Sequence, residues 1–508
     1  MNVQRKTGSG IEVIENAVGG KRLVSASIRR SSVFNPATGE QIAELPLSTN
    51  AEIDAAVAVA KAAAPAWGRT PPAKRARIMF RFYELLNANL DDLAKTLSRE
   101  HGKTHADALG EIARGLEVIE YACGIPQLLK GEFSRNVGPE IDTYSQRQPL
   151  GVAAGITPFN FPAMVPMWMY PMAIACGNTF ILKPSERDPS ASLFCWDLFQ
   201  KAGLPNGVFN IVHGDKEAVD AILDHPDIKA VSFVGSTPIA EYVYRRGTTA
   251  GKRVQALGGA KNHMVIMPDA DMDQAADALM GAGYGSAGER CMAISVAVPV
   301  GEETGNRLIA KLKPRVEALK IGPSTDSAAD MGPLITGEAQ KRVLGYIDKG
   351  IEEGAELVVD GRGFKLQGYE KGYFVGGTLF DRVTTDMSIY KDEIFGPVLC
   401  VARAETYGEA VEMINRHQYG NGTAIFTRDG DAARAFADQI EVGMVGVNVP
   451  IPVPVAYHSF GGWKRSLFGD HSIYGPEGVH FYTRLKTTTT RWPAGIREGA
   501  EFTFPNME

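Results

Sequence analysis

Gly151-Val152-Ala153-Ala154-Gly155-Ile156 is the first of four short runs that predict the fold of this chain. The other three runs are Thr179–Leu182, Ala230–Val234 and His263–Met267. Each run has the length and composition of a β-strand. The segments between them, such as 190–202 and 215–224, have helical composition. Strand and helix therefore alternate, which predicts a mostly parallel, doubly wound α/β sheet.

The residues before this core are predicted to be helical. Residues 51–64 and 73–98 have amphipathic helix patterns, and another helix pattern spans about 103–122. Asn50 is the predicted N-cap of the first helix, and Asp54 is placed to strengthen its start. We therefore expect three helices before the first strand of the core.

The residues after the core are predicted to form a second α/β block, from about 269 to 460. It contains charged helix patterns at 303–318 and 337–353. The tail has a β-rich composition at 479–490, and the sequence contains no internal repeat. A chain of 508 residues is long enough for two or three domains with a large buried core.

The composition is ordinary for a soluble globular protein, with 44% hydrophobic and 22% charged residues. The formal net charge of -6 argues against nucleic acid or an anionic membrane surface as the main partner. The first thirty residues contain no continuous apolar stretch of the kind found in a secretory signal. Residues 164–177 are apolar but carry two prolines and are too short to span a bilayer. We therefore expect a cytoplasmic protein.

Five cysteines are scattered along the chain without a Cys-x-x-Cys pair, so neither a disulfide framework nor a metal site is expected. Four of them are interpreted as small buried hydrophobic residues: Cys123, Cys176, Cys195 and Cys400. The fifth, Cys291, lies in Gly-Ser-Ala-Gly-Glu-Arg-Cys-Met at 285–292, among Gly, Ser, Glu and Arg neighbours. Cys291 is therefore the predicted nucleophile.

Three further runs supply groups that belong to the same chemistry. Pro158–Pro162 places an amide donor, Asn160, in a tight loop bounded by prolines. Lys183–Glu186 follows a predicted strand, and Glu393–Pro397 supplies a carboxylate and an aromatic face. A thiol for the carbonyl, an amide for the oxyanion and a Lys/Glu pair for a ribose together describe the oxidation of an aldehyde through a thioester.

These four runs, in this order, resemble the aldehyde dehydrogenase superfamily. The resemblance extends from Asn35–Glu40 to Tyr482–Thr487, nearly the whole chain. A finer similarity is to the methylmalonate-semialdehyde dehydrogenases, the CoA-acylating branch of that superfamily. This finer similarity is carried by Ile156–Pro162, Gly259–His263 and Gly285–Met292.

The resemblance implies an aldehyde dehydrogenase-like α/β fold, in which two doubly wound domains share a cleft and a small β extension drives oligomerisation. The implied parts are an NAD-binding domain at 1–129 and 150–258, a catalytic domain at 259–465, and oligomerisation segments at 130–149 and 466–508. A homotetramer or a homodimer is implied as well.

Cys291 would add to the aldehyde carbonyl and hold its carbon beside a nicotinamide. The positive charge of Arg290 would favour the thiolate. Preorganised donors at the developing oxyanion are worth about 100- to 1000-fold in rate. The resemblance gives this role to Asn160, with the Cys291 N–H as second donor. By spacing alone, Asn160 could equally be a turn former that bonds its own backbone.

The cofactor signal is not a glycine fingerprint, because no Gly-x-Gly-x-x-Gly follows a strand. Gly281–Gly285 has a similar composition but leads directly into the nucleophile, so we interpret it as a flexible approach to the cysteine. The predicted pyrophosphate site is Phe233–Thr237, where Gly235 and Ser236 lie between a strand and a helix.

Lys183 and Glu186 resemble the family's adenosine-ribose clamp, and Glu393 with Phe395 nearby resembles its nicotinamide-ribose site. A carboxylate at the ribose diol favours NAD because it would repel a 2′-phosphate. The alternatives are an exposed Lys/Glu pair without this role and, through the neighbouring Arg187, the use of NADP. Two more cofactor contacts are predicted at Thr157 and Phe159.

One departure from the family bears on the acyl acceptor. Ordinary aldehyde dehydrogenases carry Glu-Leu-Gly-Gly-Lys, whose Glu activates the water that hydrolyses the thioester, whereas this chain has Leu257-Gly258-Gly259-Ala260-Lys261. No Asp or Glu occurs from Tyr242 through Pro268. A thiol acceptor needs less activation than water, which suits coenzyme A. Glu289 is the rival base, and we assign it a structural or cysteine-tuning role.

A small semialdehyde acid also needs its carboxylate held, and the planar fork of Arg matches a carboxylate with two parallel hydrogen bonds. The resemblance points to Arg290 and to Arg114. The alternative for Arg114 is a solvated helix face or an ion pair with Glu111.

The leading hypothesis is therefore an NAD-dependent, CoA-acylating oxidation of methylmalonate semialdehyde or malonate semialdehyde to propionyl-CoA or acetyl-CoA. The first alternative is an NAD-dependent dehydrogenase that releases the free acid of another short semialdehyde. The second is a catalytically silent relative that serves as a structural or binding protein.

Overall fold

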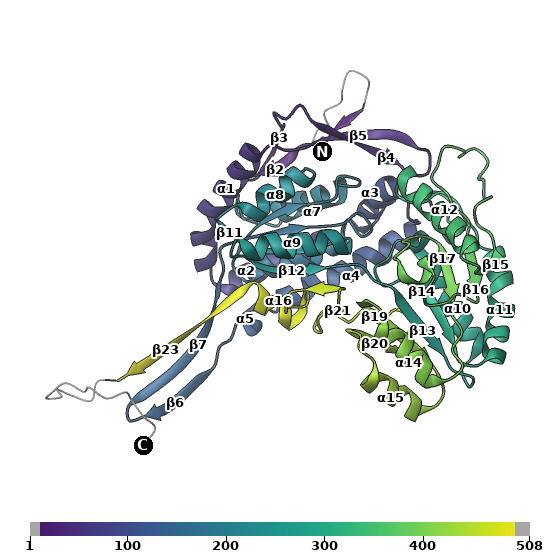
Figure 1. Cartoon of the computed structure of the whole chain (residues 1–508). Coiled ribbons are helices and arrows are strands. Elements are labelled where there is room, and N and C mark those ends of the chain that lie inside the picture. Colours follow the sequence, from purple (N-terminus) through teal and green to yellow (C-terminus); the bar gives the residue numbers. More distant parts are fainter. Residues whose placement is uncertain (1–10, 493–508) are drawn as a thin grey trace.

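The computed structural model describes residues 11–492, and Figure 1 shows two α/β lobes with a long arm that extends from one of them. The first lobe contains an eight-stranded sheet and the second a seven-stranded sheet. The predicted α/β class with two doubly wound sheets is confirmed.

The eight-stranded sheet has the order β22-β12-β11-β8-β9-β10-β2-β3. Its parallel centre consists of β8 (Val152–Ile156), β9 (Thr179–Lys183), β10 (Phe209–Ile211), β11 (Ile228–Val234) and β12 (Arg253–Leu257). Its antiparallel edges are β22 (Leu467–Phe468), β2 (Asn16–Val18) and β3 (Lys21–Leu23). Three of the four predicted strands lie in this sheet, and β12 is a strand that the sequence pattern did not predict.

Helices cover both faces of this sheet because its strands are apolar on both sides. In β8, Val152 and Ala154 belong to one hydrophobic cluster, and Ala153 between them belongs to another. The first cluster includes α1 (Asn50–Arg69), α8 (Lys216–Asp224) and α9 (Thr237–Thr249). The second includes α2 (Pro72–Asn87), α3 (Leu90–His101), α4 (His105–Cys123), α5 (Ile125–Leu128), α6 (Met164–Ala175) and α7 (Ser190–Lys201). Burial on both faces explains why the strands read as continuous apolar runs.

The predicted N-cap of α1 is wrong by one residue. Thr49, not Asn50, is the cap, because the Thr49 hydroxyl accepts the Glu52 N–H and the Glu52 carboxylate accepts the Thr49 N–H. This reciprocal pair is a capping box and satisfies two backbone donors at once. Asp54 does not take part in it and lies 3.6 Å from His225 instead.

The single helix predicted at 73–98 is also wrong, because the structure has two helices there, α2 and α3. The side chain of Asn89 donates to the Leu85 carbonyl at 2.7 Å, between the two helices. Side-chain bonds of this kind compete with the continuation of a helix. The helix predicted at about 103–122 is confirmed as α4.

The seven-stranded sheet has the order β15-β16-β17-β14-β13-β19-β20, and only β15 is antiparallel to its neighbour. Its strands are β13 (Asn262–Ile266), β14 (Ile294–Pro299), β15 (Glu356–Val359), β16 (Thr378–Asp381), β17 (Val398–Val401), β19 (Gly422–Phe426) and β20 (Met444–Val447). The helices of this lobe are α10 (Met272–Tyr284), α11 (Glu302–Glu317), α12 (Gly337–Glu352), α13 (Ser388–Lys391), α14 (Tyr407–Arg416) and α15 (Gly430–Gln439).

The helices predicted at 303–318 and 337–353 are confirmed as α11 and α12. The interpretation of Gly281–Gly285 as a flexible approach is wrong, because residues 281–284 form the last turn of α10. The short 3₁₀ turn η1 (Gly285–Gly288) follows it directly. The chain therefore leaves α10 at Tyr284 and reaches the cysteine through residues 285–290, in which Ser286 and Ala287 have non-helical backbone angles.

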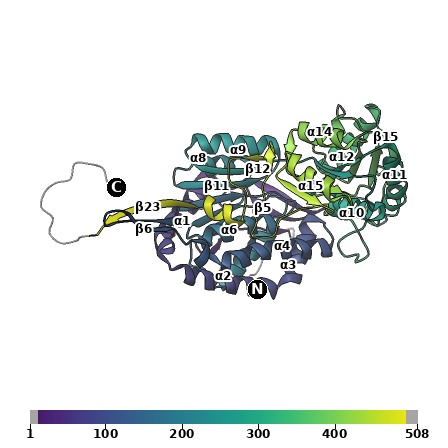
Figure 2. The same cartoon turned by 90° about the horizontal axis from the view of Figure 1, so that it is seen from below.

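The arm is a three-stranded antiparallel sheet of β6 (Phe133–Gly138), β7 (Ile141–Pro149) and β23 (Thr483–Arg491). β23 pairs with β7 over nine residues, from Thr483 opposite Pro149 to Arg491 opposite Ile141. Figure 2 shows the same arm projecting from the body after a quarter turn. The β-rich tail predicted at 479–490 is confirmed from Thr483 on, whereas residues 479–481 end α16 (Gly475–Phe481).

The remaining strands form two small sheets: β1 (Glu12–Val13), β5 (Glu40–Pro46) and β4 (Arg30–Asn35), and β18 (Tyr419–Gly420) with β21 (Trp463–Lys464). Residues 1–10 of the expected NAD-binding domain and 493–508 of the expected oligomerisation segment lie outside the described residues. Within 11–492, no helix is long and apolar enough to cross a membrane.

The connection between the two sheets places the functional residues. β12 ends at Leu257 and β13 begins at Asn262, so only residues 258–261 separate them. The edge where the strands of the first sheet end is therefore adjacent to the edge where the strands of the second sheet begin. Ligands of open α/β sheets bind beyond the carboxyl ends of the strands, which is this junction.

Candidate active site

The segments that follow β8, β9 and β11 meet at one edge of the eight-stranded sheet. Ile156 at the end of β8 is paired with Lys183 of β9 and with Phe233 of β11. Parallel neighbours end at the same edge, so the loops that follow them are neighbours too. Seven of the predicted cofactor residues lie here: Thr157, Phe159, Lys183, Glu186, Arg187, Gly235 and Ser236.

Lys183 and Glu186 form an ion pair, with 3.0 Å between Nζ and Oε2. Burial raises the pKa of Glu186, but the charges of Lys183 and Arg187 and the hydrogen bonds to the carboxylate together outweigh burial, and the net shift is downward. The carboxylate is therefore ionised at neutral pH. The alternative of an exposed Lys/Glu pair is wrong for Lys183, which is 5% exposed, while Arg187 beside them is exposed.

Two residues with hydroxyl groups, Thr157 and Ser236, lie at this edge. The Thr157 hydroxyl is buried and has no hydrogen-bond partner among residues 11–492. Ser236 is the exposed N-cap residue of α9, and its side chain does not cap the helix. Pro238 has no N–H, and the N–H groups of the next two residues donate to the Ser236 carbonyl, so the Thr237 N–H is the group at the start of α9 that is left for an anion.

The loop before the cysteine is strained and tightly packed. Ser286 and Ala287 each have φ +53°, in a backbone region that residues other than glycine rarely adopt. At Gly288, with φ +71°, a Cβ atom would lie 2.2 Å from the carbonyl oxygen of Gly396. Glycine at 288 therefore lets this loop approach the segment 393–397.

Two amide side chains hold the backbone of Cys291. Nδ2 of Asn262 and Nδ2 of Asn421 donate to its carbonyl oxygen at 2.9 and 3.0 Å. Cys291 itself is half-buried and lines a small pocket. The predicted site residues that line the same pocket are Arg290, Glu393 and Phe395.

The thiol is protonated at neutral pH in this structure. Burial raises the pKa of Cys291 to about 12, and the nearby Glu393 carboxylate adds to the rise. The charge of Arg290 acts in the opposite direction, as predicted, but it is too weak to offset them. Burial also raises the pKa of Glu393 to about 7.

Glu393 joins the pocket to the connection between the two sheets. Its Oε1 accepts the Ala260 N–H at 3.0 Å, and a Cβ at Gly259 would lie 2.4 Å from its Oε2. Phe395 packs edge-on against Phe159, with 5.9 Å between the ring centroids. The loop after β8 therefore contacts the segment that lines the cysteine pocket.

Asn160 is 4% exposed, and its backbone carbonyl accepts a hydrogen bond of 2.7 Å from Lys103 Nζ. Within the described part of the chain, its side-chain amide has no hydrogen-bond partner. A turn former would use this amide on the neighbouring backbone. The observed contacts therefore favour an amide held ready for another group, and the oxyanion role remains a prediction.

Arg290 forms an ion pair with Asp107 in the first turn of α4. Burial raises the pKa of Asp107, but the charges of Arg290 and Lys103 and the hydrogen bonds to the carboxylate together lower it overall. The other terminal nitrogen of Arg290 lies 3.4 Å from the carbonyl oxygen of Gly281. The guanidinium is thus tied to α4 and α10 at the edge of the cysteine pocket.

Arg114 is held by a different set of groups. It pairs with Glu117 at 2.7 Å and donates to the Pro454 carbonyl at 2.8 Å, so the alternative of an ion pair with Glu111 is wrong. The Tyr474 hydroxyl donates to the same carbonyl at 3.0 Å. Arg114 is not among the residues that line the cysteine pocket, whereas Arg290 is.

Leu257 and Glu289 are the two positions that bear on the acyl acceptor. Leu257 is 3% exposed in the core of the first lobe. Glu289 is fully buried, its Oε1 accepts the Ile335 N–H at 3.5 Å, and burial raises its pKa to about 8. Glu289 does not line the cysteine pocket, which favours the structural role over that of a base.

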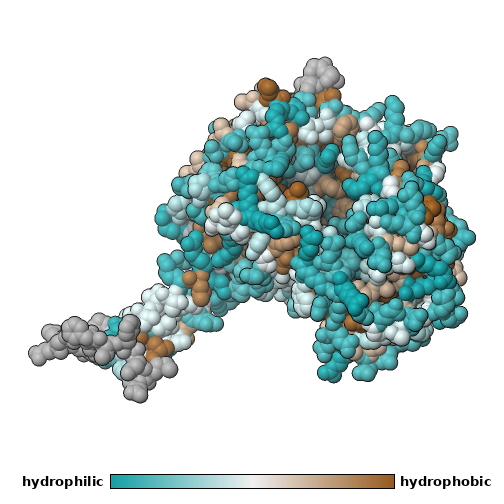
Figure 3. Space-filling view, in the orientation of Figure 1, coloured by the Kyte–Doolittle hydropathy of each residue, from teal (hydrophilic) through white to brown (hydrophobic). Residues whose placement is uncertain are grey.

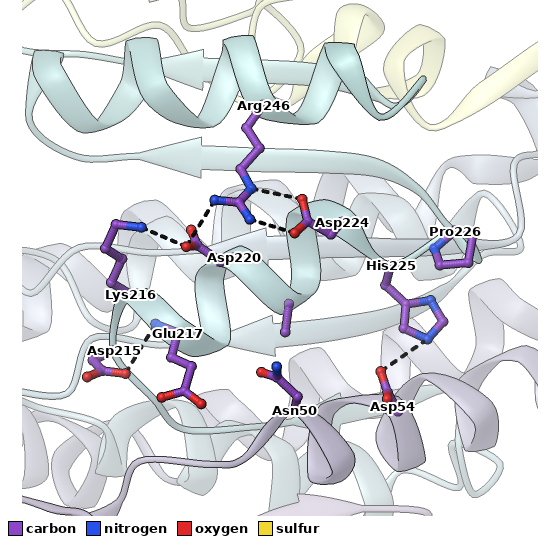
Figure 4. Close-up of a pocket in the computed structure, with 11 residues that line it drawn as sticks. Asn50, Asp54, Asp215, Lys216, Glu217, Asp220, Asp224, His225, Pro226 and Arg246 are labelled. Carbon is purple, nitrogen blue, oxygen red and sulfur yellow. Dashed lines mark hydrogen bonds and ion pairs between the residues drawn. The ribbon is translucent and has the colours of Figure 1, made fainter.

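A second hollow lies between α1, α8 and α9, away from all predicted site residues (Figure 4). Most of its charged side chains pair with one another: Arg246 with Asp220 and Asp224, Lys216 with Asp220, and His225 with Asp54. Asp215 and Glu217 pair with Arg29 instead. Mutual pairing satisfies these charges within the protein. The candidate active site is therefore the cysteine pocket.

Several residues that shape the site were missed by the sequence analysis. Lys261 donates to the carbonyls of Ile389 and Asp392 at 2.7 and 2.8 Å and so anchors the residue before Glu393. It stands in the quoted run Gly259–His263, which was a signal for it. Lys103 and Asp107 gave no signal in the sequence, and Glu111 was named only as a possible partner of Arg114.

The comparisons with known proteins agree with the geometry. The model of the aldehyde dehydrogenase family matches residues 23–488. The malonate-semialdehyde dehydrogenase of Pseudomonas aeruginosa is 64% identical over 486 residues, which cover 96% of this chain and 98% of that protein. The human mitochondrial methylmalonate-semialdehyde/malonate-semialdehyde dehydrogenase (acylating) is 49% identical over 484 residues, which cover 95% and 90%.

A crystal structure from Sinorhizobium meliloti 1021 in complex with NAD, provisionally described as a methylmalonate-semialdehyde dehydrogenase, has 64% sequence identity to this chain. It matches with a TM-score of 0.95, covering 96% of this chain and 99% of the other. The resemblance expected from the motifs is therefore confirmed over nearly the whole chain.

Proposed function

Since the chain belongs to the aldehyde dehydrogenase family, we propose that its cysteine pocket carries out an NAD-dependent, CoA-acylating oxidation of malonate semialdehyde or methylmalonate semialdehyde. The products would be acetyl-CoA or propionyl-CoA. The names of the similar proteins from Pseudomonas aeruginosa and human support this substrate class. The observation that carries the CoA-acylating assignment is Leu257, a buried apolar residue where the family's hydrolytic members have their water-activating Glu.

The first chemical step would use Cys291 and Asn160. The Cys291 thiol would first give up its proton to water. The thiolate would then add to the aldehyde carbon, and the oxyanion that forms would accept hydrogen bonds from the Asn160 amide and the Cys291 N–H. Support comes from the free Asn160 amide and from the carbonyl bonds that fix the Cys291 backbone. Bound NAD would accept the hydride, and a thioester at Cys291 would remain.

The residues at the carboxyl edge of the first sheet fit a dinucleotide. The buried Thr157 hydroxyl lacks a partner among residues 11–492, and the Thr237 N–H at the start of α9 is uncapped by a side chain. Gly235 and Ser236 would hold the pyrophosphate there. Lys183 and Glu186, with Arg187 beside them, would hold the adenosine ribose, and Glu393 the nicotinamide ribose, with Phe159 and Phe395 packing nearby.

The substrate carboxylate would be held by an arginine. Arg290 lines the pocket next to Cys291 and has donors that Asp107 does not occupy, which supports its role. Arg114 stays a candidate, although its guanidinium is already engaged by Glu117 and Pro454.

A substrate panel tests this function. The purified protein should be given short semialdehydes with NAD and CoA, and NADH and acyl-CoA should be read by absorbance and by mass. We expect malonate and methylmalonate semialdehyde to give acetyl-CoA and propionyl-CoA. Release of a free acid as the main product would contradict the acylating assignment. If no aldehyde gives NADH, the alternative of a catalytically silent relative would be favoured.

We predict a strong preference for NAD over NADP. Glu186→Gln should lower the ratio of kcat/KM with NAD to kcat/KM with NADP about tenfold. The ionised Glu186 carboxylate would repel a 2′-phosphate, and a tenfold change corresponds to about 1.4 kcal/mol. Steady-state kinetics with both cofactors measures the ratio. Glu412→Gln, an exposed carboxylate on the other lobe, is the control and should leave the ratio unchanged. Equal turnover of the unaltered protein with NAD and NADP would show that Glu186 does not face the ribose.

The arm would mediate assembly into a homodimer or homotetramer. β23 lies at the open edge of its sheet, and Figure 3 shows hydrophobic residues on the arm, where Phe133 and Leu485 are 63% and 56% exposed. Open strand edges and exposed apolar side chains are features of subunit interfaces. A mass from light scattering that corresponds to one chain at micromolar concentration would contradict this.

A cytoplasmic location is part of the proposal. All five cysteines are free, as is usual in a reducing compartment. Fractionation of the source cells with an antibody against the protein would test this location.

A further inference from the structure

We infer that the buried ion pair between Lys103 and Glu111 is a positioning device for the loop that carries Asn160. This loop, residues 157–163 between β8 and α6, is called the Asn160 loop below. The inference deepens the proposed function, on which it rests, because it assigns two further residues to the oxyanion step. Neither residue is placed at the reacting atoms, so both act through Asn160.

The ion pair is completely enclosed. Lys103 Nζ lies 2.6 Å from Glu111 Oε2, and both side chains are 0% exposed. Lys103 comes from the turn between α3 and α4, and Glu111 from the second turn of α4. Charges removed from water in this way are stabilised only if each finds several partners. The partners they find show what the pair does.

Nearly every partner outside the pair belongs to the Asn160 loop or to the residue that follows it. Lys103 Nζ donates to the Asn160 carbonyl at 2.7 Å and lies 4.4 Å from the centroid of the Phe161 ring. Glu111 Oε1 accepts the N–H groups of Ala163 and Met164 at 2.8 and 3.0 Å. The pair therefore holds the loop at the residue that carries the amide and at the end of the loop.

Glu111 also satisfies backbone N–H groups at the N-terminus of α6. No side chain of α6 itself caps this helix, so the first N–H groups would otherwise lack partners. A carboxylate at a helix N-terminus is stabilised by these N–H groups and by the helix dipole. Glu111 thus serves as a cap supplied by α4, and it fixes the direction in which the loop enters α6.

The start of α4 also contacts the loop that carries Cys291. Asp107, between Lys103 and Glu111 in sequence, pairs with Arg290 next to Cys291. One rigid helix end therefore contacts both the loop with the nucleophile and the loop with the oxyanion donor. Since a displacement of about 1 Å can cost about 100-fold in rate, a common frame for the two loops matters to the reaction.

Lys103→Met and Glu111→Gln test the inference. We expect each to lower the pre-steady-state rate of NADH formation about 10- to 100-fold, because Asn160 is no longer held. The dissociation constant of NAD, measured by fluorescence quenching, should change by a smaller factor than the rate, because the pair contacts the loop only from Asn160 onward, beyond the cofactor residues Thr157 and Phe159. The double variant Lys103→Met with Glu111→Gln removes both charges together. It replaces Lys103→Met in these measurements if that single variant does not fold.

A double-substitution cycle with Asn160→Ala separates positioning from general damage. If the pair acts through Asn160, adding Lys103→Met to the Asn160→Ala variant should lower the NADH rate further by a factor of less than about three. If the pair merely supports the fold, the substitution should cost the same factor in both backgrounds, which would overturn the inference.

Hydrogen exchange of the peptide that spans 157–164 gives a readout without any substrate. We expect faster exchange of this peptide in Lys103→Met and in Glu111→Gln. Arg403→Met is the matched control, because it breaks another largely buried pair, with Asp381 at 2.6 Å, on the other lobe. It should lower thermal stability without changing either the exchange of 157–164 or the NADH rate.

The outcomes separate the inference from the proposed function. An unaltered protein that forms NADH, with variants that form it equally fast, contradicts the positioning role alone. An unaltered protein that forms no NADH contradicts the proposed function, and unchanged exchange at 157–164 then overturns the positioning role independently.

Discussion

Cys291→Ala is expected to abolish NADH formation, by a factor of about 10⁴ or more, while NAD still binds with nearly unchanged affinity. The reason is that the thioester forms on this sulfur, and loss of a nucleophile removes the whole covalent route. The other four cysteines are buried in the cores and do not line the pocket. Stopped-flow absorbance of NADH, with NAD titrated separately, measures both quantities.

The control for this variant is Cys123→Ala, which removes a buried cysteine of the first lobe. It should keep NADH formation and lose only stability, since removal of a buried sulfur leaves a small cavity. Substantial turnover in Cys291→Ala would refute the thioester mechanism, whatever the control shows.

The second large effect concerns the acyl acceptor. Without CoA, we expect a burst of about one NADH per Cys291 and then almost no turnover, because water attack lacks the Glu that Leu257 replaces. With CoA present, steady-state turnover should rise by a factor of about 100 or more, since a thiol needs less activation than water. Rapid-mixing absorbance with and without CoA gives both phases, and mass spectrometry identifies the acylated Cys291 peptide.

Leu257→Glu extends this test. It should restore some hydrolysis, but a carboxylate at a site that is 3% exposed should also lower stability. If the unaltered protein turns over fully to the free acid without CoA, the interpretation of Leu257 is wrong. The rival bases are then Glu289 and Glu393, and Glu393 is favoured by geometry because it lines the pocket and has a pKa of about 7.

The strands of the core could be predicted because burial on both faces makes each one a continuous apolar run, as in β8 and β9. The helix boundaries could not be predicted to the residue, because they depend on single side chains. Thr49 rather than Asn50 caps α1, and the bond from Asn89 to Leu85 marks a break that apolar spacing does not reveal. Such local choices are decided by hydrogen bonds that composition does not encode.

The candidate site could be predicted where its residues stand in short runs, such as those around Cys291 and Asn160. It could not be predicted where contacts join distant segments. The bond from Lys103 to Asn160 spans 57 positions, and nothing in either run signals it. For Arg114, one sequence alternative named Glu111, but Glu117 lies on the accessible side of the helix while Glu111 turns into the core.

The nine-residue pairing of β23 with β7 has a consequence for biosynthesis. Thr143 and Thr489 face each other across it although 346 positions separate them. At about 5 to 20 residues per second on the ribosome, β7 waits about 20 to 70 seconds for its partner strand. During this interval one edge of β7 is open in every nascent chain, and neighbouring chains on one messenger could pair there prematurely. Chaperone demand during synthesis should therefore centre on residues 141–149.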